Sequence, residues 1–219
     1  MAVAMTDHAF AARLLVVADL DYVGDEARWL ALLGTVGAAA VGRPVAIQVR
    51  AKHLDGAEAS DLAARARDAV PQDVTLLLNG PTVLAAQLGY TGVHWPEADI
   101  PTARPPQPLA FRSAAVHSIE AARRAEAAGA DLVIAGAVYA PGSHPGEGMG
   151  LDAFGVIARA TSLPVFAIGG IHPAQVEDCM RAGAAGVAVV SGILGAPDGA
   201  SAIDEYLQAI DAATGSEPA

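Results

Sequence analysis

Three polar side chains alternate at the end of an apolar segment and predict an anion-binding site. The segment Pro44 to Arg50 contains Gln48 and ends at Arg50, and Lys52 follows two residues later. Alternate residues of a strand point to the same side, and three polar groups aimed together are costly to bury without a partner. Arg50 can bind an anion through two parallel hydrogen bonds, and Lys52 adds a point charge. The structural alternative is a salt-bridged interior or a solvated strand end.

Two turns of small residues, about twenty positions apart, predict a phosphate site. One apolar run ends in Gly169 and Gly170, and the next ends in Val190 and Ser191. Bare backbone N–H groups at such turns bind phosphate. In a (β/α)8 barrel the usual phosphate site lies in the loops after strands 7 and 8. If these runs are the last two strands of a barrel, the ligand is a phosphorylated small molecule.

Further polar residues follow two segments in the middle of the chain. Asn79 closes a run of three leucines, and it is either a ligand-binding residue or the N-cap of the next helix. His94 is either a catalyst or a structural hydrogen-bonding group. Asp99 either belongs to the same site or caps the segment that follows it.

The segment from Gly136 to Gly150 is too long and too rich in glycine for a minimal connection. Such a loop is commonly a lid or a ligand cradle. Ser143 is its candidate for substrate binding and His144 its candidate for catalysis. A flexible exposed loop without a role in binding is the alternative.

The elements that must position these residues alternate between strand-like and helix-like segments. The expected strands are Arg13 to Asp19, Pro44 to Arg50, Asp73 to Asn79, Gly92 to Trp95, Pro108 to Arg112, Ala130 to Gly136, Pro164 to Ile168 and Ala185 to Ser191. The expected helices include Ala57 to Val70, Ser118 to Gly129, Leu151 to Thr161, Pro173 to Gly183 and Ala200 to Ala212. Eight β/α units predict an α/β fold, a single (β/α)8 TIM barrel over residues 1–219 with short irregular N- and C-terminal tails.

An open, doubly wound sheet is the rival fold. Its dinucleotide-binding form needs G-x-G-x-x-G after the first strand. This chain instead reads Asp19-Leu-Asp-Tyr-Val-Gly24 there, which favours the barrel.

Composition limits the partners and the compartment. The chain has 219 residues and a net charge of −11, which argues against nucleic acid and anionic membranes as partners. No apolar run is long enough to span a bilayer, and residues 1–8 lack the pattern of an export signal. Cys179 is the one cysteine, which excludes an internal disulfide and fits a cytoplasmic protein.

Taken together, these segments resemble the thiamine phosphate synthase and TenI family, in order and at matching spacing from about Leu14 to Leu194. The likeness rests on Gln48 to Lys52, Asn79, Gly92 to His94, His117 and Ser118, Gly136 to Tyr139, Ala167 to Ile171 and Gly186 to Ser191. The resemblance implies a (β/α)8 barrel, a role in thiamine biosynthesis and a thiazole phosphate held by the two turns of small residues.

Synthases of this family join a pyrimidine pyrophosphate to a thiazole phosphate with the help of Mg²⁺. The resemblance implies that Gln48, Arg50, Lys52 and Asn79 hold the pyrimidine pyrophosphate and that Asp99 is one magnesium carboxylate. Such chemistry depends on anion clamps and metal carboxylates.

Four synthase positions are altered in this chain. Gly80 stands where a second magnesium carboxylate is expected, and His144 and Pro141 stand where the loop carries a lysine and a threonine. The synthase serine falls on Ala115, unless a shift brings Ser113 into its place. Losing a metal ligand and a fixed positive charge should weaken both substrate binding and the departure of pyrophosphate.

TenI proteins are similar to the synthases in fold, but they isomerise a thiazole carboxylate phosphate and typically lack the full metal set. Gly80 and Pro96 resemble that branch. The histidine that tautomerases carry after strand 6 is Ala137 here, so His144 or His94 would have to supply the imidazole.

We therefore predict a TenI-like enzyme that binds a thiazole phosphate, with His144, His94 and Lys52 as catalytic candidates. The alternatives are a thiamine phosphate synthase that also binds pyrimidine pyrophosphate, and a noncatalytic thiazole- or thiamine-phosphate-binding protein. Mg²⁺ is expected only if Asp99 binds it, and no other cofactor is expected. The sequence leaves open whether the protein forms a homo-oligomer.

Overall fold

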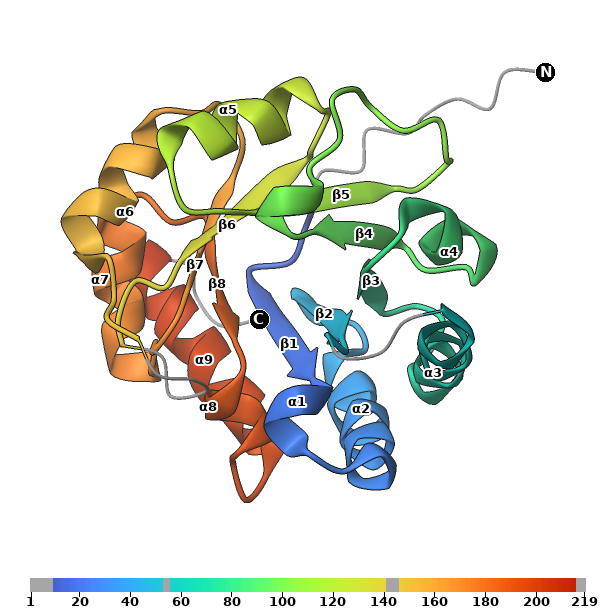
Figure 1. The fold of residues 1–219 in the computed structure, drawn as a ribbon. Coiled ribbons are helices and arrows are strands. Elements are labelled where there is room, and N and C mark those ends of the chain that lie inside the picture. The colour runs from blue at the N-terminus through green and yellow to red at the C-terminus, as the bar shows by residue number, and fades with distance from the viewer. Residues whose placement is uncertain (1–9, 53–55, 141–145, 216–219) are drawn as a thin grey trace.

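The computed structural model describes residues 10–52, 56–140 and 146–215. Within these residues, eight parallel strands form a closed barrel in chain order, with β8 hydrogen-bonded to β1 (Figure 1). The strands are β1 (Leu14–Asp19), β2 (Val45–Arg50), β3 (Thr75–Asn79), β4 (Gly92–Trp95), β5 (Phe111–Val116), β6 (Leu132–Gly136), β7 (Val165–Ile168) and β8 (Gly186–Val189). The predicted TIM barrel is confirmed, and the expected terminal tails, residues 1–9 and 216–219, lie outside the described residues.

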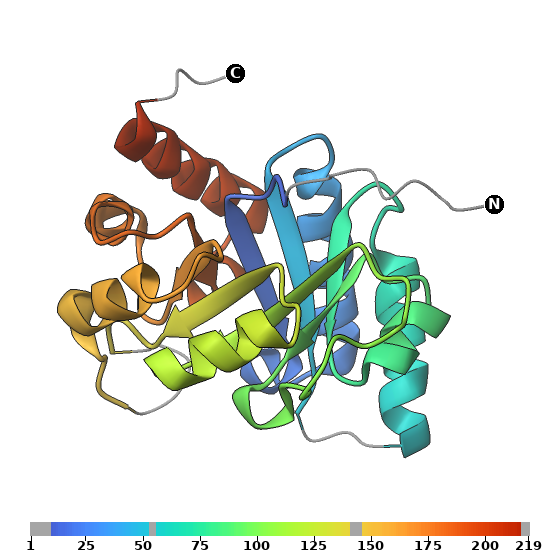
Figure 2. The ribbon, with the colours of Figure 1, turned by 90° about the horizontal axis from the view of Figure 1, so that it is seen from above.

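Helices cover the outside of the barrel. They are α1 (Leu20–Val23), α2 (Glu26–Ala40), α3 (Gly56–Ala69), α4 (Thr82–Gln87), α5 (Ile119–Ala127), α6 (Gly150–Arg159), α7 (Val176–Arg181), α8 (Ser191–Leu194) and α9 (Gly199–Thr214), with 3₁₀ turns η1 (Glu97–Asp99) and η2 (Pro173–Gln175). Figure 2 shows α3 on one side of the strands and α6 and α7 on the other. None of the described helices combines the length and the apolar character needed to cross a membrane.

Local sequence signals set several helix ends. The Ser118 side chain accepts a hydrogen bond from the Ala121 N–H at 3.1 Å, which makes Ser118 the N-cap of α5. Gly129 and Gly183, the last residues of two expected helical ranges, have φ values of 78° and 108° and lie just past the ends of α5 and α7. A left-handed conformation at these positions ends a helix and favours glycine.

The side chains of the strands fill two layers. Inside the barrel lies a small cluster of Leu15, Val17, Ala46, Leu77, Phe111, Leu132, Ile134, Phe166 and Ala188. The Phe10 ring packs edge-on against two rings of this cluster, with its centroid 5.1 Å from that of Phe111 and 5.8 Å from that of Phe166. The alternate side chains pack outward against the helices. Because aromatic rings fill the amino ends of the strands, the carboxyl ends are left for a ligand.

Two predictions of local structure were wrong. The predicted strand Pro108 to Arg112 is displaced, since β5 is Phe111–Val116, and the buried Arg112 side chain binds the Leu109 and Gln107 carbonyls at 3.1 and 2.6 Å. These two backbone carbonyls accept hydrogen bonds from the Arg112 side chain, whereas in a strand they would accept them from a neighbouring strand. The predicted helix Pro173 to Gly183 is divided into η2 and α7. The helices α2 and α4 were not among those named from the sequence, because their alanine-containing segments give a weak apolar pattern.

Candidate functional site

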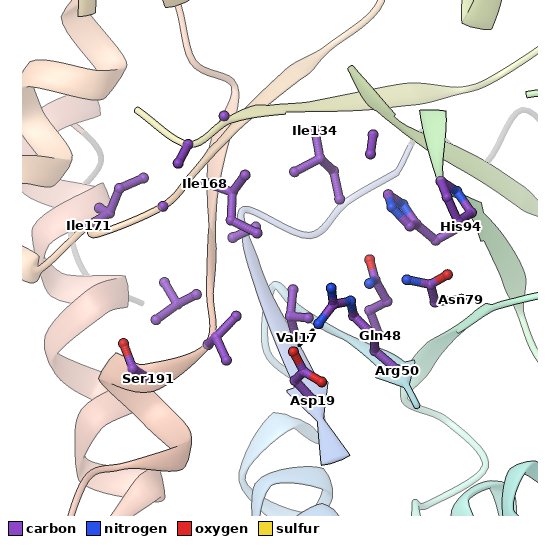
Figure 3. A pocket seen from close by; sticks show the side chains of 18 of the residues that line it. Val17, Asp19, Gln48, Arg50, Asn79, His94, Ile134, Ile168, Ile171 and Ser191 are labelled. Atoms are coloured by element: carbon purple, nitrogen blue, oxygen red, sulfur yellow. Dashed lines mark hydrogen bonds and ion pairs between the residues drawn. The ribbon is translucent and has the colours of Figure 1, made fainter. Parts of the chain in front are cut away.

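A cavity of about 360 Å³ opens at the carboxyl ends of the strands. Its floor is apolar and includes Val17, Ile134, Ile168 and Ala188. Polar and glycine residues line the rest, namely Asp19, Gln48, Arg50, Lys52, Asn79, His94, Glu97, His117, Gly136, Gly169, Gly170 and Ser191. Figure 3 shows Gln48, Arg50 and Asn79 on one side of this cavity and Ile171 and Ser191 on the other.

The polar residues at the end of β2 reach the same cavity. Gln48, Arg50 and Lys52 all line it, as their alternation predicted. Gln48 is 3% exposed, and its side-chain oxygen Oε1 is buried with no hydrogen-bond partner among the described residues. A buried acceptor without a donor is destabilising. A ligand that brings an N–H or O–H group to this oxygen would remove that cost.

Asp19 is a residue of this cavity that the sequence analysis missed. It is the last residue of β1, and its Cα is paired with that of Arg50 at the end of β2. The Arg50 guanidinium donates to the Asp19 carboxylate through Nη1. The sequence did contain a signal for this contact, because Asp19 ends the strand that precedes the one with Gln48, Arg50 and Lys52. Asp19 was considered only as part of a segment that lacks a dinucleotide-binding motif.

His94 lies deep in the cavity and is held by β5. Its Nδ1 is 2.9 Å from the Ser113 hydroxyl oxygen. Burial and, second to it, the positive charge of Arg50 lower the pKa of His94 to about 3. At neutral pH the ring is therefore uncharged, which suits a hydrogen-bonding group better than a proton carrier.

Asn79 joins the central cavity to a second, smaller one. This side pocket, of about 290 Å³, lies between the ends of β2 and β3 and the helices α3 and α4, and it also contains Gly80 and Asp99. Asn79 is not a helix N-cap, because Pro81 holds that position at α4. Asp99, the expected metal carboxylate, lines the side pocket and is exposed. Among the described residues, no three His, Cys, Asp or Glu side chains form a group that could hold a metal ion.

Two glycines and several apolar side chains line the opposite side of the cavity. Gly169 and Gly170 have φ values of 102° and 63°, which only glycine adopts readily. A Cβ at Gly169 would lie 2.4 Å from the Ala137 Cβ, and one at Gly170 would lie 2.3 Å from the Ala140 carbonyl oxygen. The two glycines therefore let the turn pack directly against the segment after β6. Val190 and Ser191, at the start of α8, line the same cavity.

Glu97 and His117 form a second pair that the sequence analysis missed. His117 donates its backbone N–H to Glu97 Oε2 at 2.8 Å, and its ring Nδ1 lies 2.7 Å from the same oxygen. Both residues line the cavity. They are 20 residues apart, on η1 and at the end of β5, so spacing alone did not predict the contact.

The positions at which the chain departs from its resemblance also have places in the structure. Ala115 lines the cavity, whereas Ser113 is fully buried against His94. Ala137 lines the cavity with a methyl group where tautomerases are expected to carry histidine. Ser143 and His144 lie outside the described residues.

Known proteins resemble this chain in sequence and in fold. It is 37% identical over 177 residues to thiamine-phosphate synthase of Roseiflexus sp. (strain RS-1), covering 77% of this chain and 74% of that protein. It is 40% identical over 166 residues to thiamine-phosphate synthase of Methanoculleus marisnigri, covering 73% and 79%. A thiamine biosynthesis bifunctional protein of Symbiobacterium thermophilum is 39% identical over 175 residues, but the chain spans only 36% of its length.

A solved structure and a family profile agree with these relatives. The thiamine phosphate pyrophosphorylase of Pyrococcus furiosus superposes with a TM-score of 0.74 at 25% identity, over 94% of this chain and 98% of that one. The profile described as thiamine monophosphate synthase matches residues 22–193. The chain therefore belongs to the thiamine monophosphate synthase family of thiamine biosynthesis.

Proposed function

We propose that this protein is a thiamine phosphate synthase, which joins a pyrimidine pyrophosphate to a thiazole phosphate. The observation that carries the proposal is that two separate sets of anion-binding groups line one cavity. One set is the side chains of Gln48, Arg50 and Lys52, and the other is the turns at Gly170 and Ser191. An isomerase acting on a thiazole carboxylate phosphate binds no pyrophosphate, so its second set has to match only a carboxylate. The synthase names of the relatives also favour this function over the TenI-like isomerase that the sequence first suggested.

In the proposed reaction, the bond between the pyrimidine methylene carbon and the pyrophosphate oxygen breaks. The electron pair of that bond leaves with pyrophosphate, and the lone pair of the thiazole nitrogen forms the new C–N bond. Arg50 and Lys52 would hold the pyrophosphate and stabilise its growing charge. The backbone N–H groups at Gly170 and Ser191 would hold the thiazole phosphate in line for attack.

Gln48 would orient the pyrimidine ring. Its buried Oε1 lacks a donor among the described residues, so an N–H of an amino substituent on the ring would complete its hydrogen bonding. The apolar floor at Val17, Ile134 and Ile168 would keep water from the reactive methylene.

The residues of the side pocket fit a Mg²⁺ ion that arrives with the pyrophosphate. Mg²⁺ usually takes one or two protein carboxylates and completes its shell with phosphate oxygens and water. Asp99 and the Asn79 oxygen line this pocket beside Arg50 and Lys52, and they would hold the ion. When bound, Mg²⁺ would neutralise part of the charge on the leaving pyrophosphate.

The test is direct synthesis. Purified protein receives pyrimidine pyrophosphate, thiazole phosphate and Mg²⁺, and the products are separated by chromatography. We expect thiamine phosphate and pyrophosphate in equal amounts, with formation lost in Arg50→Ala. Binding of both substrates without any product would overturn the proposal and favour a noncatalytic binding protein.

A second candidate function is isomerisation of a thiazole carboxylate phosphate, and the Glu97–His117 pair favours it. An imidazole that a carboxylate holds in place is a common arrangement for proton transfer. Gly80, in place of a second acid beside Asn79, agrees with this function. The same assay, given the carboxylated tautomer alone, should yield the isomerised thiazole, and His117→Gln should abolish it. Isomerisation without thiamine phosphate synthesis would replace the first proposal with this one.

A further inference from the structure

Asp19 and Arg50 form an ion pair at the one place where β1 and β2 both end on the cavity. Their Cα atoms are register partners in the parallel ladder, and both side chains line the cavity (Figure 3). Neither position depends on a flexible loop, because each is the last residue of a barrel strand. The pair is thus built into the rigid part of the site.

Both oxygens of the Asp19 carboxylate have partners. Oδ1 accepts the Asp21 backbone N–H at 3.2 Å as the N-cap of α1, and Oδ2 accepts from Arg50 Nη1. The Asp19 side chain is only 7% exposed. Burial raises the pKa of Asp19 above its ordinary value, and the Arg50 charge opposes that rise. A carboxylate buried to this degree is costly unless a cation stays beside it.

The cost of an unpaired Asp19 keeps Arg50 in one orientation. A long arginine side chain at a strand end would otherwise sample many rotamers and lose that freedom when it binds an anion. Asp19 engages Nη1, and the guanidinium carries five N–H donors in a fixed fork. The remaining donors are therefore already oriented when a ligand arrives, which is the general benefit of preorganisation.

We propose that Asp19 is a positioning residue that holds the Arg50 guanidinium for the pyrophosphate of the substrate. The proposal rests on the synthase function above. It predicts that loss of the Asp19 charge weakens binding of pyrophosphate even though a negative charge has been removed from beside the anion. A residue that merely repels the anion would give the opposite sign.

Asp19→Asn separates the ion pair from the helix cap. Asparagine caps helices as well as aspartate does, so α1 keeps its N-terminal hydrogen bond. With its one oxygen on the Asp21 N–H, the amide would turn its NH₂ group toward Arg50, and donor would face donor. Asp25→Asn is the matched control, because Asp25 caps α2 through the Arg28 N–H at 2.7 Å and does not line the cavity. It removes the same charge and keeps the same kind of cap.

Isothermal titration with inorganic pyrophosphate measures the effect without turnover. We expect the dissociation constant to rise about tenfold in Asp19→Asn, the size typical of losing a hydrogen bond between charged groups, and to be unchanged in Asp25→Asn. In the synthesis assay, KM for pyrimidine pyrophosphate should rise by the same factor while KM for thiazole phosphate stays within about twofold.

A double-mutant cycle shows whether Asp19 acts through Arg50. In an Arg50→Met background, which has no guanidinium to position, Asp19→Asn should cause no further loss of pyrophosphate binding. Unchanged or tighter pyrophosphate binding in Asp19→Asn would overturn the inference, and so would an equal loss of binding in both backgrounds. The proposed function would still stand if the unmodified protein synthesised thiamine phosphate. An unmodified protein that neither bound pyrophosphate nor formed product would overturn both.

Discussion

The two sides of the cavity are built from different parts of the chain. At the ends of β2 and β3 the lining is polar side chain, from Gln48, Arg50 and Asn79. At β7 and β8 the lining combines the glycine turn at Gly170 and the start of α8 at Ser191 with apolar side chains such as Ile171. Side chains can be exchanged one at a time without moving the strand beneath them. A turn that depends on positive φ and close backbone contact tolerates almost no change. The polar side chains at β2 and β3 can therefore change one at a time, while the glycine turn after β7 is kept or lost as a whole.

This difference explains where the chain departs from the family it resembles. The positions that the resemblance marks as altered are Gly80, Ala115, Ala137, Pro141 and His144, and none of them belongs to the turns at Gly169 and Gly170 or at Val190 and Ser191. If the turns hold the thiazole phosphate, proteins of this kind would bind the phosphate in the same way and differ in the reaction that they catalyse. Substitutions that weaken binding of one ligand and spare binding of the other test whether the two sides of the cavity act independently.

The largest effect is expected from Gly170→Ala. Its φ of 63° costs alanine about 1–2 kcal/mol, and the new Cβ would lie 2.3 Å from the Ala140 carbonyl oxygen. The turn would have to move, so we expect affinity for thiazole phosphate to fall by about 100-fold or more, while inorganic pyrophosphate binds within about threefold of normal. Titration of each ligand measures both.

Gly89→Ala is the control for this substitution. Gly89 has a φ of 71° with open space around the added Cβ, so it reproduces the backbone cost without the collision. It should leave both affinities unchanged. Equal loss of both ligands in Gly170→Ala would show that the two sides are not independent, and retained thiazole phosphate binding would remove the turn from the site.

Arg50→Lys should give the next largest effect, and on the opposite ligand. Lysine keeps the charge but loses the fork that binds an anion through two hydrogen bonds. We expect KM for pyrimidine pyrophosphate to rise by about 30-fold, or about 2 kcal/mol, with KM for thiazole phosphate unchanged. Arg43→Lys, in an ion pair with Asp204 outside the cavity, is the control and should alter neither constant. An effect on thiazole phosphate as large as that on pyrimidine pyrophosphate would contradict the division of the cavity.

Gln48→Leu should separate stability from binding. Leucine removes the buried oxygen that lacks a partner, so the free energy of unfolding should rise by about 1 kcal/mol or stay the same. Loss of the hydrogen bond to the pyrimidine should raise KM for pyrimidine pyrophosphate by about tenfold. Thermal unfolding and steady-state kinetics measure the two effects. A large loss of stability would mean that Gln48 holds the barrel together and has no partner to gain from a ligand.

The sequence predicted the barrel and most of the polar side chains of the cavity because both follow from short-range patterns. Alternation within β2 identified Gln48 and Arg50, and the spacing of small residues identified Gly169 and Gly170. The Asp19–Arg50 and Glu97–His117 contacts were missed because each joins residues 20 or more positions apart. Strand register and loop approach decide such contacts, and neither is visible in one sequence without the fold.

His94, another polar side chain of the cavity, should affect the stability of the protein and its dependence on pH. Its pKa of about 3 lies below the ordinary value of 6.5, so between these values the unfolded chain binds a proton that the folded protein does not. Stability should therefore increase as pH rises from 3 to 6.5, by at most about 1.4 kcal/mol per pH unit from this residue, and stay level above that range. His94→Gln should flatten this part of the curve. Urea unfolding at pH 5 and pH 7 measures the difference, which should shrink by about 2 kcal/mol in the variant. An unchanged pH dependence would mean that His94 is protonated in the folded cavity, and the ring would then count among its anion-binding groups.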